Sequence, residues 1–172
     1  MALALLILSL AAIAAVLMLY PLLLRLCTLR AKRQGVSPLA RAPAEDLPTV
    51  TGIVAARNAE SMIEDKVLNC LTLEYPEQKL DFIFCSDGST DATAERLQAL
   101  AAENPRLHVL VTVQHEGKIA ALNRAAELCG TDILLFTDVD AALAPDALHK
   151  MVQHFQDPAI GGVCGRREIA EQ

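Results

Sequence analysis

The chain has 172 residues, of which 53% are hydrophobic and only 3% aromatic, and its formal net charge at pH 7 is −6. All 21 acidic residues follow residue 33, against 11 of the 15 Lys and Arg residues, so the rest of the chain carries a formal charge of about −10. Nucleic-acid binding needs a basic face and aromatic stacking platforms. We therefore expect no nucleic-acid partner.

The first 33 residues are predicted to form a transmembrane helix with a basic flank. No charged side chain occurs in residues 2–24, and at about 1.5 Å per residue such a helix spans the roughly 30 Å hydrocarbon core of a bilayer. A cleaved signal peptide would need a basic residue before the apolar run and a cleavage site soon after it. The basic residues instead follow, at Arg25, Arg30, Lys32 and Arg33, which predicts a single-pass protein of the cell (inner) membrane with a cytoplasmic soluble domain.

Residues 34–48 are typical of a linker, because Gly35, Pro38, Pro43 and Pro48 occur there without apolar periodicity. A folded domain is expected over residues 49–172. The five cysteines of the chain form no CxxC pair, so we expect them to pack as small apolar side chains in a reducing compartment.

Within the expected domain, apolar strands alternate with amphipathic helices. This order is typical of an α/β fold with a mostly parallel sheet flanked by helices, whose ligands bind at the carboxyl edge of the strands. Strands are predicted at residues 50–56, 80–86, 107–113 and 131–138 and near 159–165, and helices at about 60–73, from about 91, at 118–128 and from Pro145.

Polar residues collect directly after three of these strands. The first cluster is Arg57-Asn58-Ala59-Glu60, the second is SDGSTD at 86–91, and the third contains Asp138 and Asp140. The hydroxyls of the second cluster are expected to cap a helix around a glycine turn. Asp87, at the strand end, is instead predicted to accept hydrogen bonds from a planar ligand.

Lys118 follows a glycine at the expected start of a helix. Thr112 and Ile119 exclude a phosphate-binding P-loop, and Ile119 also excludes an HExxH zinc motif. A lysine at a helix N-terminus suits a phosphate-bearing ligand, and a solvated surface lysine is the alternative.

Asp138 and Asp140 end an apolar run with one valine between them. If the strand continues through both, their side chains project from the same face, roughly 6 to 7 Å apart. A divalent cation would remove their repulsion, and Mg²⁺ or Mn²⁺ typically binds one or two carboxylates together with ligand phosphates. A solvated loop is the simpler alternative.

The segments IVAARNAE, FCSDGSTDAT, HEGKIAALNRA, ILLFTDVDAAL and GGVCGR, in this order across residues 49–167, resemble the nucleotide-binding half of the inverting family 2 glycosyltransferases, which have a GT-A fold. The resemblance implies an enzyme that uses a nucleotide sugar, commonly a UDP-sugar, with Mn²⁺ or Mg²⁺ and a glycan or lipid-linked acceptor.

The resemblance also implies roles for single residues. The segment from Ala56 through Arg57 and Asn58 to Glu60, together with Asp87, would hold the nucleoside base. Lys118 would lie beside the nucleotide. Asp138 would contact the ribose or the metal, and Asp140 would bind the metal that bridges the diphosphate.

The chain departs from the family pattern in two places. Ala55 replaces a frequent proline, and the family's general base and its Gln-x-x-Arg-Trp motif lie beyond GGVCGR, whereas this chain ends at Gln172 and has no tryptophan. No residue is therefore assigned as catalytic base, and we expect a donor-binding half that is incomplete at its C-terminus.

Two alternatives remain open. The chain could be a non-catalytic or split nucleotide-binding module completed by another polypeptide. Self-association is a separate expectation, because an incomplete domain leaves a strand edge and apolar faces uncovered. A phosphatase of the haloacid dehalogenase type also places two acids after an apolar strand, but Ala141 and Ala142 stand where that pattern expects Gly and Thr or Val.

Overall fold

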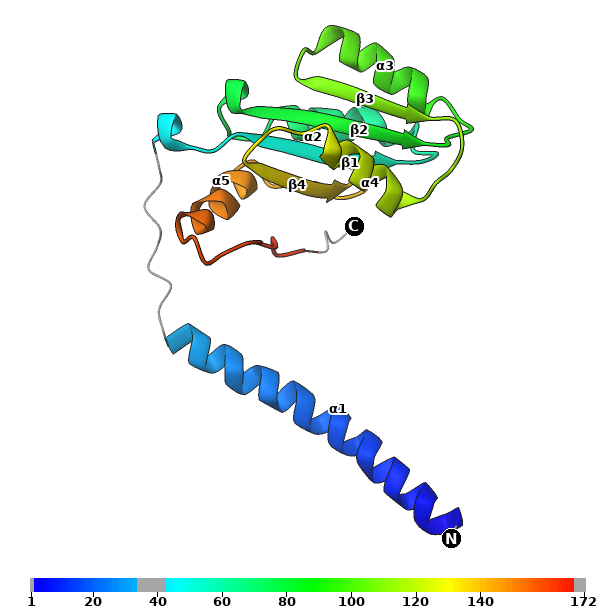
Figure 1. Cartoon of the computed structure of the whole chain (residues 1–172), viewed down its shortest axis with the longest axis vertical. Coiled ribbons are helices and arrows are strands. Elements are labelled where there is room, and N and C mark those ends of the chain that lie inside the picture. The colour runs from blue at the N-terminus through cyan, green and yellow to red at the C-terminus, as the bar shows by residue number, and fades with distance from the viewer. Residues whose placement is uncertain (1, 34–42, 169–172) are drawn as a thin grey trace. The chain divides into compact units, whose positions relative to one another are not determined.

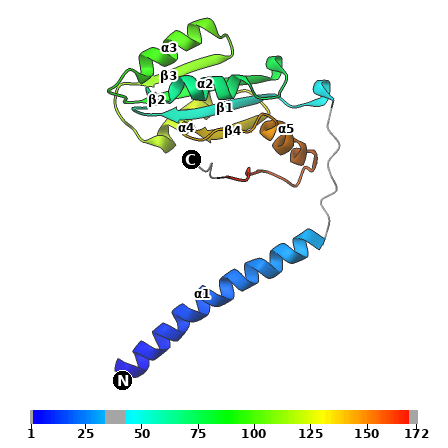
Figure 2. The ribbon, with the colours of Figure 1, turned by 180° about the vertical axis from the view of Figure 1, so that it is seen from behind.

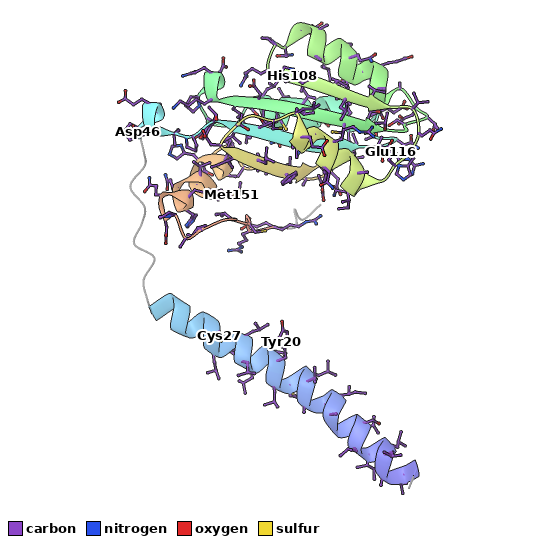
Figure 3. The ribbon with its side chains drawn as sticks, viewed as in Figure 1. Tyr20, Cys27, Asp46, His108, Glu116 and Met151 are labelled. Carbon is purple, nitrogen blue, oxygen red and sulfur yellow. The ribbon has the colours of Figure 1, made fainter. Side chains whose placement is uncertain are left out.

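A computed structural model describes residues 2–33 and 43–168. The chain divides into two compact units, residues 1–39 and 40–172. The first contains the helix α1 (Ala2–Arg33), in which Leu3–Cys27 has a mean hydropathy of 2.7. Its apolar side chains point outward all round the helix, as Tyr20 and Cys27 illustrate (Figure 3). By length and composition, this helix can cross a membrane.

The second unit is a four-stranded parallel sheet with helices between the strands (Figure 1). This confirms the predicted α/β class. The strands are β1 (Val50–Ala56), β2 (Leu80–Asp87), β3 (Leu107–Thr112) and β4 (Ile133–Asp138), and the α-helices are α2 (Ile63–Leu71), α3 (Thr93–Glu103), α4 (Lys118–Glu127) and α5 (Ala147–Val152). Short 3-10 helices span Ala44–Asp46, Glu77–Lys79 and Gln153–Gln156.

Helices cover both faces of the sheet. Helices α2, α3 and α5 pack on the face that carries Val54 and Phe84, whereas α4 packs on the opposite face against Ile53 and Ile83 (Figures 1 and 2). This alternation follows from the period of two along a strand. Because both faces are covered, the strands are mostly apolar on both faces.

The strand order is β3-β2-β1-β4. The chain builds outward from β1 to β2 and β3 and then returns to place β4 on the other side of β1, with Ala55 opposite Asp138 in the register. Helix α4 makes this return, and its Ala121 and Ala125 pack against the sheet. The order of strands therefore reverses between β1 and β4, where ligands of open α/β sheets bind.

The strand expected near residues 159–165 is a wrong prediction. In the part of the chain that the structure describes, this segment forms no strand, and a pocket of about 500 Å³ has residues 160–163 on one side and residues 132–136 on the other. Gly161 and Gly162 have no side chains with which to fill that space. The segment therefore lies beside β4 without pairing to it.

The start of α5 was also predicted too early. The helix begins at Ala147 with Asp146 at its N-cap, so Pro145 lies before its first residue rather than at it.

The packed domain begins before Thr49. Leu47 is only 5% exposed and belongs to the core, and the Tyr75 hydroxyl donates a hydrogen bond of 2.6 Å to the carbonyl oxygen of Pro48. Lys79 donates to the carbonyl oxygens of Glu45 and Leu47, each at 2.6 Å. Residues 34–42 of the expected linker lie outside the described residues.

Candidate functional site

The loops that follow the four strands all lie at the carboxyl edge of the sheet. Figure 3 marks this end by Glu116, in the loop between β3 and α4. Parallel strands bring their carboxyl ends to one edge, so the three polar clusters of the sequence gather here. A fourth segment, residues 113–117, joins them.

The first cluster is tied to the second through side chains. Asn58 adopts a left-handed backbone conformation, with a φ of 48°, and its Oδ1 accepts a hydrogen bond of 2.8 Å from the amide of Thr90. Glu60 donates its amide to Asp91 at 3.2 Å and accepts at Oε2 from the amide of Ala92 at 3.0 Å. Asn58 and Glu60 therefore hold two loops together.

The other two residues of this cluster with an assigned role differ in exposure. Ala56 is buried at the end of β1, where its backbone is paired with that of Ser86. Arg57 is exposed and, within the described residues, makes no side-chain hydrogen bond or ion pair. Its guanidinium is thus the available donor of the cluster.

Asp87 is buried and accepts hydrogen bonds from four groups. The side chain is 4% exposed. Its Oδ1 accepts from the Glu116 amide at 2.9 Å and the Thr112 hydroxyl at 3.1 Å, and its Oδ2 from the Gly117 amide at 2.9 Å and the His115 ring at 2.7 Å. Burial alone would raise the pKa of Asp87, but these four hydrogen bonds hold it below its ordinary value.

This network gives Asp87 a role that the sequence did not indicate. A carboxylate has about four acceptor positions, and residues Thr112 to Gly117 donate four hydrogen bonds to Asp87. Asp87 therefore fixes that loop and the start of α4, and a direct contact with a nucleobase stays a prediction.

Lys118, the first residue of α4, forms an ion pair with Asp138 at the end of β4. The hydrogen bond from Lys118 lowers the pKa of Asp138, against a smaller effect of burial, and the charges of Arg167 and Lys66 lower it further. The two side chains are half exposed. Lys118 and Asp138 are thus brought together where the strand order reverses.

Asp140 does not continue the strand, so the expectation that both acids project from the same face of one strand is wrong. Strand β4 ends at Asp138, residues 139–140 form a turn, and the amide of Ala141 donates to the carbonyl oxygen of Asp138 at 3.2 Å. The turn forms as Val139 packs against the core. Asp140 lines a pocket of about 230 Å³ beside α2, whereas Asp138 contacts α4.

Helix α2 holds the segment around this turn through two residues that sequence reasoning missed. Lys66 donates to the Thr137 hydroxyl and the Ala141 carbonyl oxygen, and Asn69 exchanges two hydrogen bonds with the backbone of Leu143. The sequence did contain a signal for Lys66, because this lysine lies three residues after Ile63 and so on the apolar face of the helix.

The residues present fit a hard divalent cation. Asp138 and Asp140 offer exposed carboxylate oxygens, and within the described residues no group of three His, Cys, Asp or Glu side chains forms a metal cage. Mg²⁺ and Mn²⁺ commonly bind one or two carboxylates with phosphates and water in the remaining positions. Structural zinc would need four protein ligands.

Comparison with protein families identifies the domain. The model of "Glycosyl transferase family 2" matches residues 51–172. This confirms the resemblance drawn from the sequence motifs.

Two curated relatives match about three quarters of the chain. A beta-monoglucosyldiacylglycerol synthase of Nostoc sp. is 37% identical over 126 residues, which are 72% of this chain and 27% of the relative. A poly-beta-1,6-N-acetyl-D-glucosamine synthase of Staphylococcus aureus is 32% identical over 126 residues, 73% of this chain and 30% of the relative. The chain thus spans less than a third of the length of these relatives.

Solved structures share the fold. A mannosyltransferase from Pyrobaculum calidifontis, in complex with GDP-Man and Mn²⁺, has a TM-score of 0.69 and 33% identity over 88% of this chain and 44% of its own. TarS 1–349 of S. aureus has a TM-score of 0.56 at 21% identity, over 71% of this chain and 38% of its own. The second likeness concerns the fold alone.

Proposed function

Because the chain belongs to glycosyl transferase family 2, we propose that it transfers a sugar from a nucleotide-sugar donor to a glycan or lipid-linked acceptor. The described domain is, in this proposal, the donor-binding half. The observation that supports the proposal is the ion pair of Lys118 with Asp138, which lies where the strand order reverses. In the proposal, Lys118 is the cation for phosphate and Asp138 a carboxylate for metal.

Each side chain receives a role from its position. Arg57, exposed and without an ion pair in the described residues, contacts the nucleoside, and Ala56, Asn58, Glu60 and Asp87 shape the walls around it. Lys118 and the N-terminal amides of α4 bind the diphosphate, because the N-terminus of a helix favours anions.

Asp138 and Asp140 are the proposed ligands of Mn²⁺ or Mg²⁺, as oxygen donors from the two sides of one turn. When bound, the metal supplies positive charge that stabilises the departing diphosphate. Asp138 and Asp140 would hold the metal beside the diphosphate, and Lys118, at the start of α4, would neutralise part of the charge of the diphosphate. No residue of the described chain is assigned as the base that deprotonates the acceptor.

The identity of the nucleotide is a separate proposal. Uridine is the base we propose from the family resemblance, whereas the mannosyltransferase from Pyrobaculum calidifontis was solved with GDP-Man. Both nucleotides therefore belong in the binding experiment.

We also propose that α1 anchors the enzyme as a single span in the cell (inner) membrane with the sheet domain in the cytoplasm. The support is the length and apolar character of Leu3–Cys27 and the basic residues that follow it. The names of the curated relatives describe synthases of a glycolipid and of a polysaccharide, which favours an acceptor at the membrane. Protease digestion of spheroplasts and of inverted vesicles tests the orientation, and we expect cleavage of the domain in inverted vesicles only.

The donor site is tested by titrating UDP and GDP into the full chain in detergent, with and without Mn²⁺. We expect saturable binding of one nucleotide that needs the metal. In Asp140→Ala this metal-dependent part should disappear, while Glu103→Ala, which removes an exposed carboxylate at the end of α3, should bind as the wild type does. Equal binding by Asp140→Ala and wild type would refute the metal role.

A further inference from the structure

Lys66 is the one buried lysine among those whose exposure is described, at 3%. It projects from α2, and its ammonium donates to Thr137 Oγ1 at 2.9 Å and to the carbonyl oxygen of Ala141 at 2.5 Å. Thr137 directly precedes Asp138, and Ala141 directly follows Asp140. Lys66 therefore holds the residues on both sides of the acidic turn, Asp138–Asp140.

The positive charge of Lys66 needs more than these two neutral acceptors. Burial of an ammonium costs several kcal/mol unless opposite charges compensate it. Burial lowers the pKa of Lys66, and Cys70, Asp138 and Asp140 oppose that effect. Cys70 is uncharged near neutral pH, since burial raises its pKa to about 11. The two carboxylates are thus the anions that compensate Lys66.

We infer that Lys66 is a positioning residue for the Asp138–Asp140 turn. Its two hydrogen bonds fix the residues on both sides of the turn, so that the two carboxylates keep one arrangement before a metal and a diphosphate bind. The inference rests on the proposed donor site. Lys66 acts through the turn and does not itself contact the donor.

A purely structural role is the alternative, and the chain contains a matched control for it. Lys79 also donates to two acceptors that tie separate segments together, the carbonyl oxygens of Glu45 and Leu47. It precedes β2, at the opposite end of the strands from the candidate site. Substitution of Lys66 removes two hydrogen bonds next to the acidic turn, and substitution of Lys79 removes two hydrogen bonds far from it, so the two losses can be compared.

The experiment compares Lys66→Met, Lys79→Met and wild type as full chains in detergent, below the melting temperature of each. Mn²⁺-dependent binding of UDP and GDP is measured by calorimetry. Lys66→Met should weaken this binding by about 10- to 100-fold, the range found when a residue supporting metal ligands is lost. Lys79→Met should bind as the wild type does.

A second readout follows the turn without any ligand. Amide hydrogen exchange of residues 137–143 should speed up in Lys66→Met and stay unchanged in Lys79→Met, because Lys66 makes hydrogen bonds to this segment and Lys79 makes none of those described. Lys66→Gln, which keeps a donor for one of the two acceptors, replaces the methionine variant if that variant does not fold, and should show an intermediate effect in both measurements.

The two proposals fail in different ways. If the wild-type protein binds neither nucleotide in the presence of Mn²⁺, the proposed donor site is refuted. The amide-exchange measurement then tests by itself whether Lys66 positions the turn. Nucleotide binding that is unchanged in Lys66→Met while the wild type binds overturns the inference about Lys66. So does an exchange rate of residues 137–143 that equals the wild-type rate.

Discussion

The ammonium of Lys118 contacts the carboxylate of Asp138, which ties the start of α4 to the end of β4. The second acid of the motif, Asp140, turns toward α2 and Lys66 instead. Each carboxylate of the pair thus has a lysine of the chain nearby. The two like charges are compensated before any metal binds, and a bound cation must share Asp138 with Lys118.

This sharing predicts opposite effects of Lys118→Met on two ligands. Mn²⁺ alone should bind up to about five-fold more tightly, because an exposed ion pair that competes for the carboxylate contributes about 0.2–1 kcal/mol. UDP or GDP with Mn²⁺ should bind at least about ten-fold more weakly, since a hydrogen bond to a charged group contributes about 1.5–3 kcal/mol. Electron paramagnetic resonance of free Mn²⁺ measures the first affinity and calorimetry the second.

Lys150→Met is the control for this prediction. Lys150 forms an exposed ion pair with Asp146 at 2.6 Å on α5, so its loss removes the same charge away from the acidic turn. Both affinities should stay at the wild-type level. A Lys118→Met variant that loses affinity for Mn²⁺ alone would contradict competition between the lysine and the metal.

Asp87→Asn is expected to destabilise the domain by about 2 to 4 kcal/mol, because an amide cannot accept all four hydrogen bonds and leaves buried donors unpaired. The loss should be accompanied by faster amide exchange at Glu116 and Gly117. Asp81→Asn, on the same strand but with no hydrogen bond to its side chain in the described residues, serves as control. Urea unfolding of the full chain in detergent measures the difference.

The destabilisation by Asp87→Asn should depend on pH. The pKa of Asp87 is lowered in the folded state, so its contribution to stability is complete above the unfolded-state pKa of about 3.9 and is lost as the pH falls through the folded-state value. The gap in unfolding free energy between wild type and variant should be constant from pH 7 to about 5 and narrow below about 4. A gap that stays constant into the acid range would show that the charge of Asp87 is not what stabilises the loop.

Gly88 directly follows Asp87 and lies against the loop that contains His115, so it should tolerate no side chain. Its φ is 61°, and a Cβ atom would lie 2.5 Å from the backbone nitrogen of His115. Gly88→Ala is expected to cost about 2 to 4 kcal/mol from the left-handed conformation and the clash. Gly130→Ala, where an added Cβ meets no atom within 4 Å, should change the unfolding free energy far less, and equal losses in the two variants would argue against this close approach.

The fold could be predicted from the sequence wherever one local pattern decided the outcome. The strands of residues 50–56, 80–87 and 133–138 are mostly apolar, and the helix starting at Lys118 follows a glycine, so these elements were expected within a residue or two. The segment 159–165 failed because a strand needs a partner as well as a pattern. Strand β4 offers an edge, but a pocket separates it from Gly161 and Gly162.

The site could be predicted less fully, because local patterns do not say which partner a polar side chain finds. The positions after the strands follow from the parallel sheet, whereas the four donors on Asp87 come from residues 25 to 30 positions later. The turn at Asp140 depends on how Val139 packs into the core. Such contacts between distant segments are set by tertiary packing.

Arg57 and Asn58 are adjacent in the sequence but should respond to substitution in opposite ways. Arg57 is exposed and without an ion pair in the described residues, so Arg57→Met should weaken Mn²⁺-dependent binding of UDP or GDP by about ten-fold and leave the melting temperature unchanged. Calorimetry and thermal unfolding of the same samples provide the two measurements.

Asn58 should affect stability first, because its side chain ties the first loop to Thr90. Asn58→Gly keeps the left-handed backbone and loses only the hydrogen bonds, at a cost of about 1 kcal/mol. Asn58→Ala should cost about 1–2 kcal/mol more, since alanine is strained at a φ of 48°. If Asn58→Gly instead abolishes nucleotide binding with no loss of stability, the side chain contacts the nucleoside and the tie between the loops is secondary.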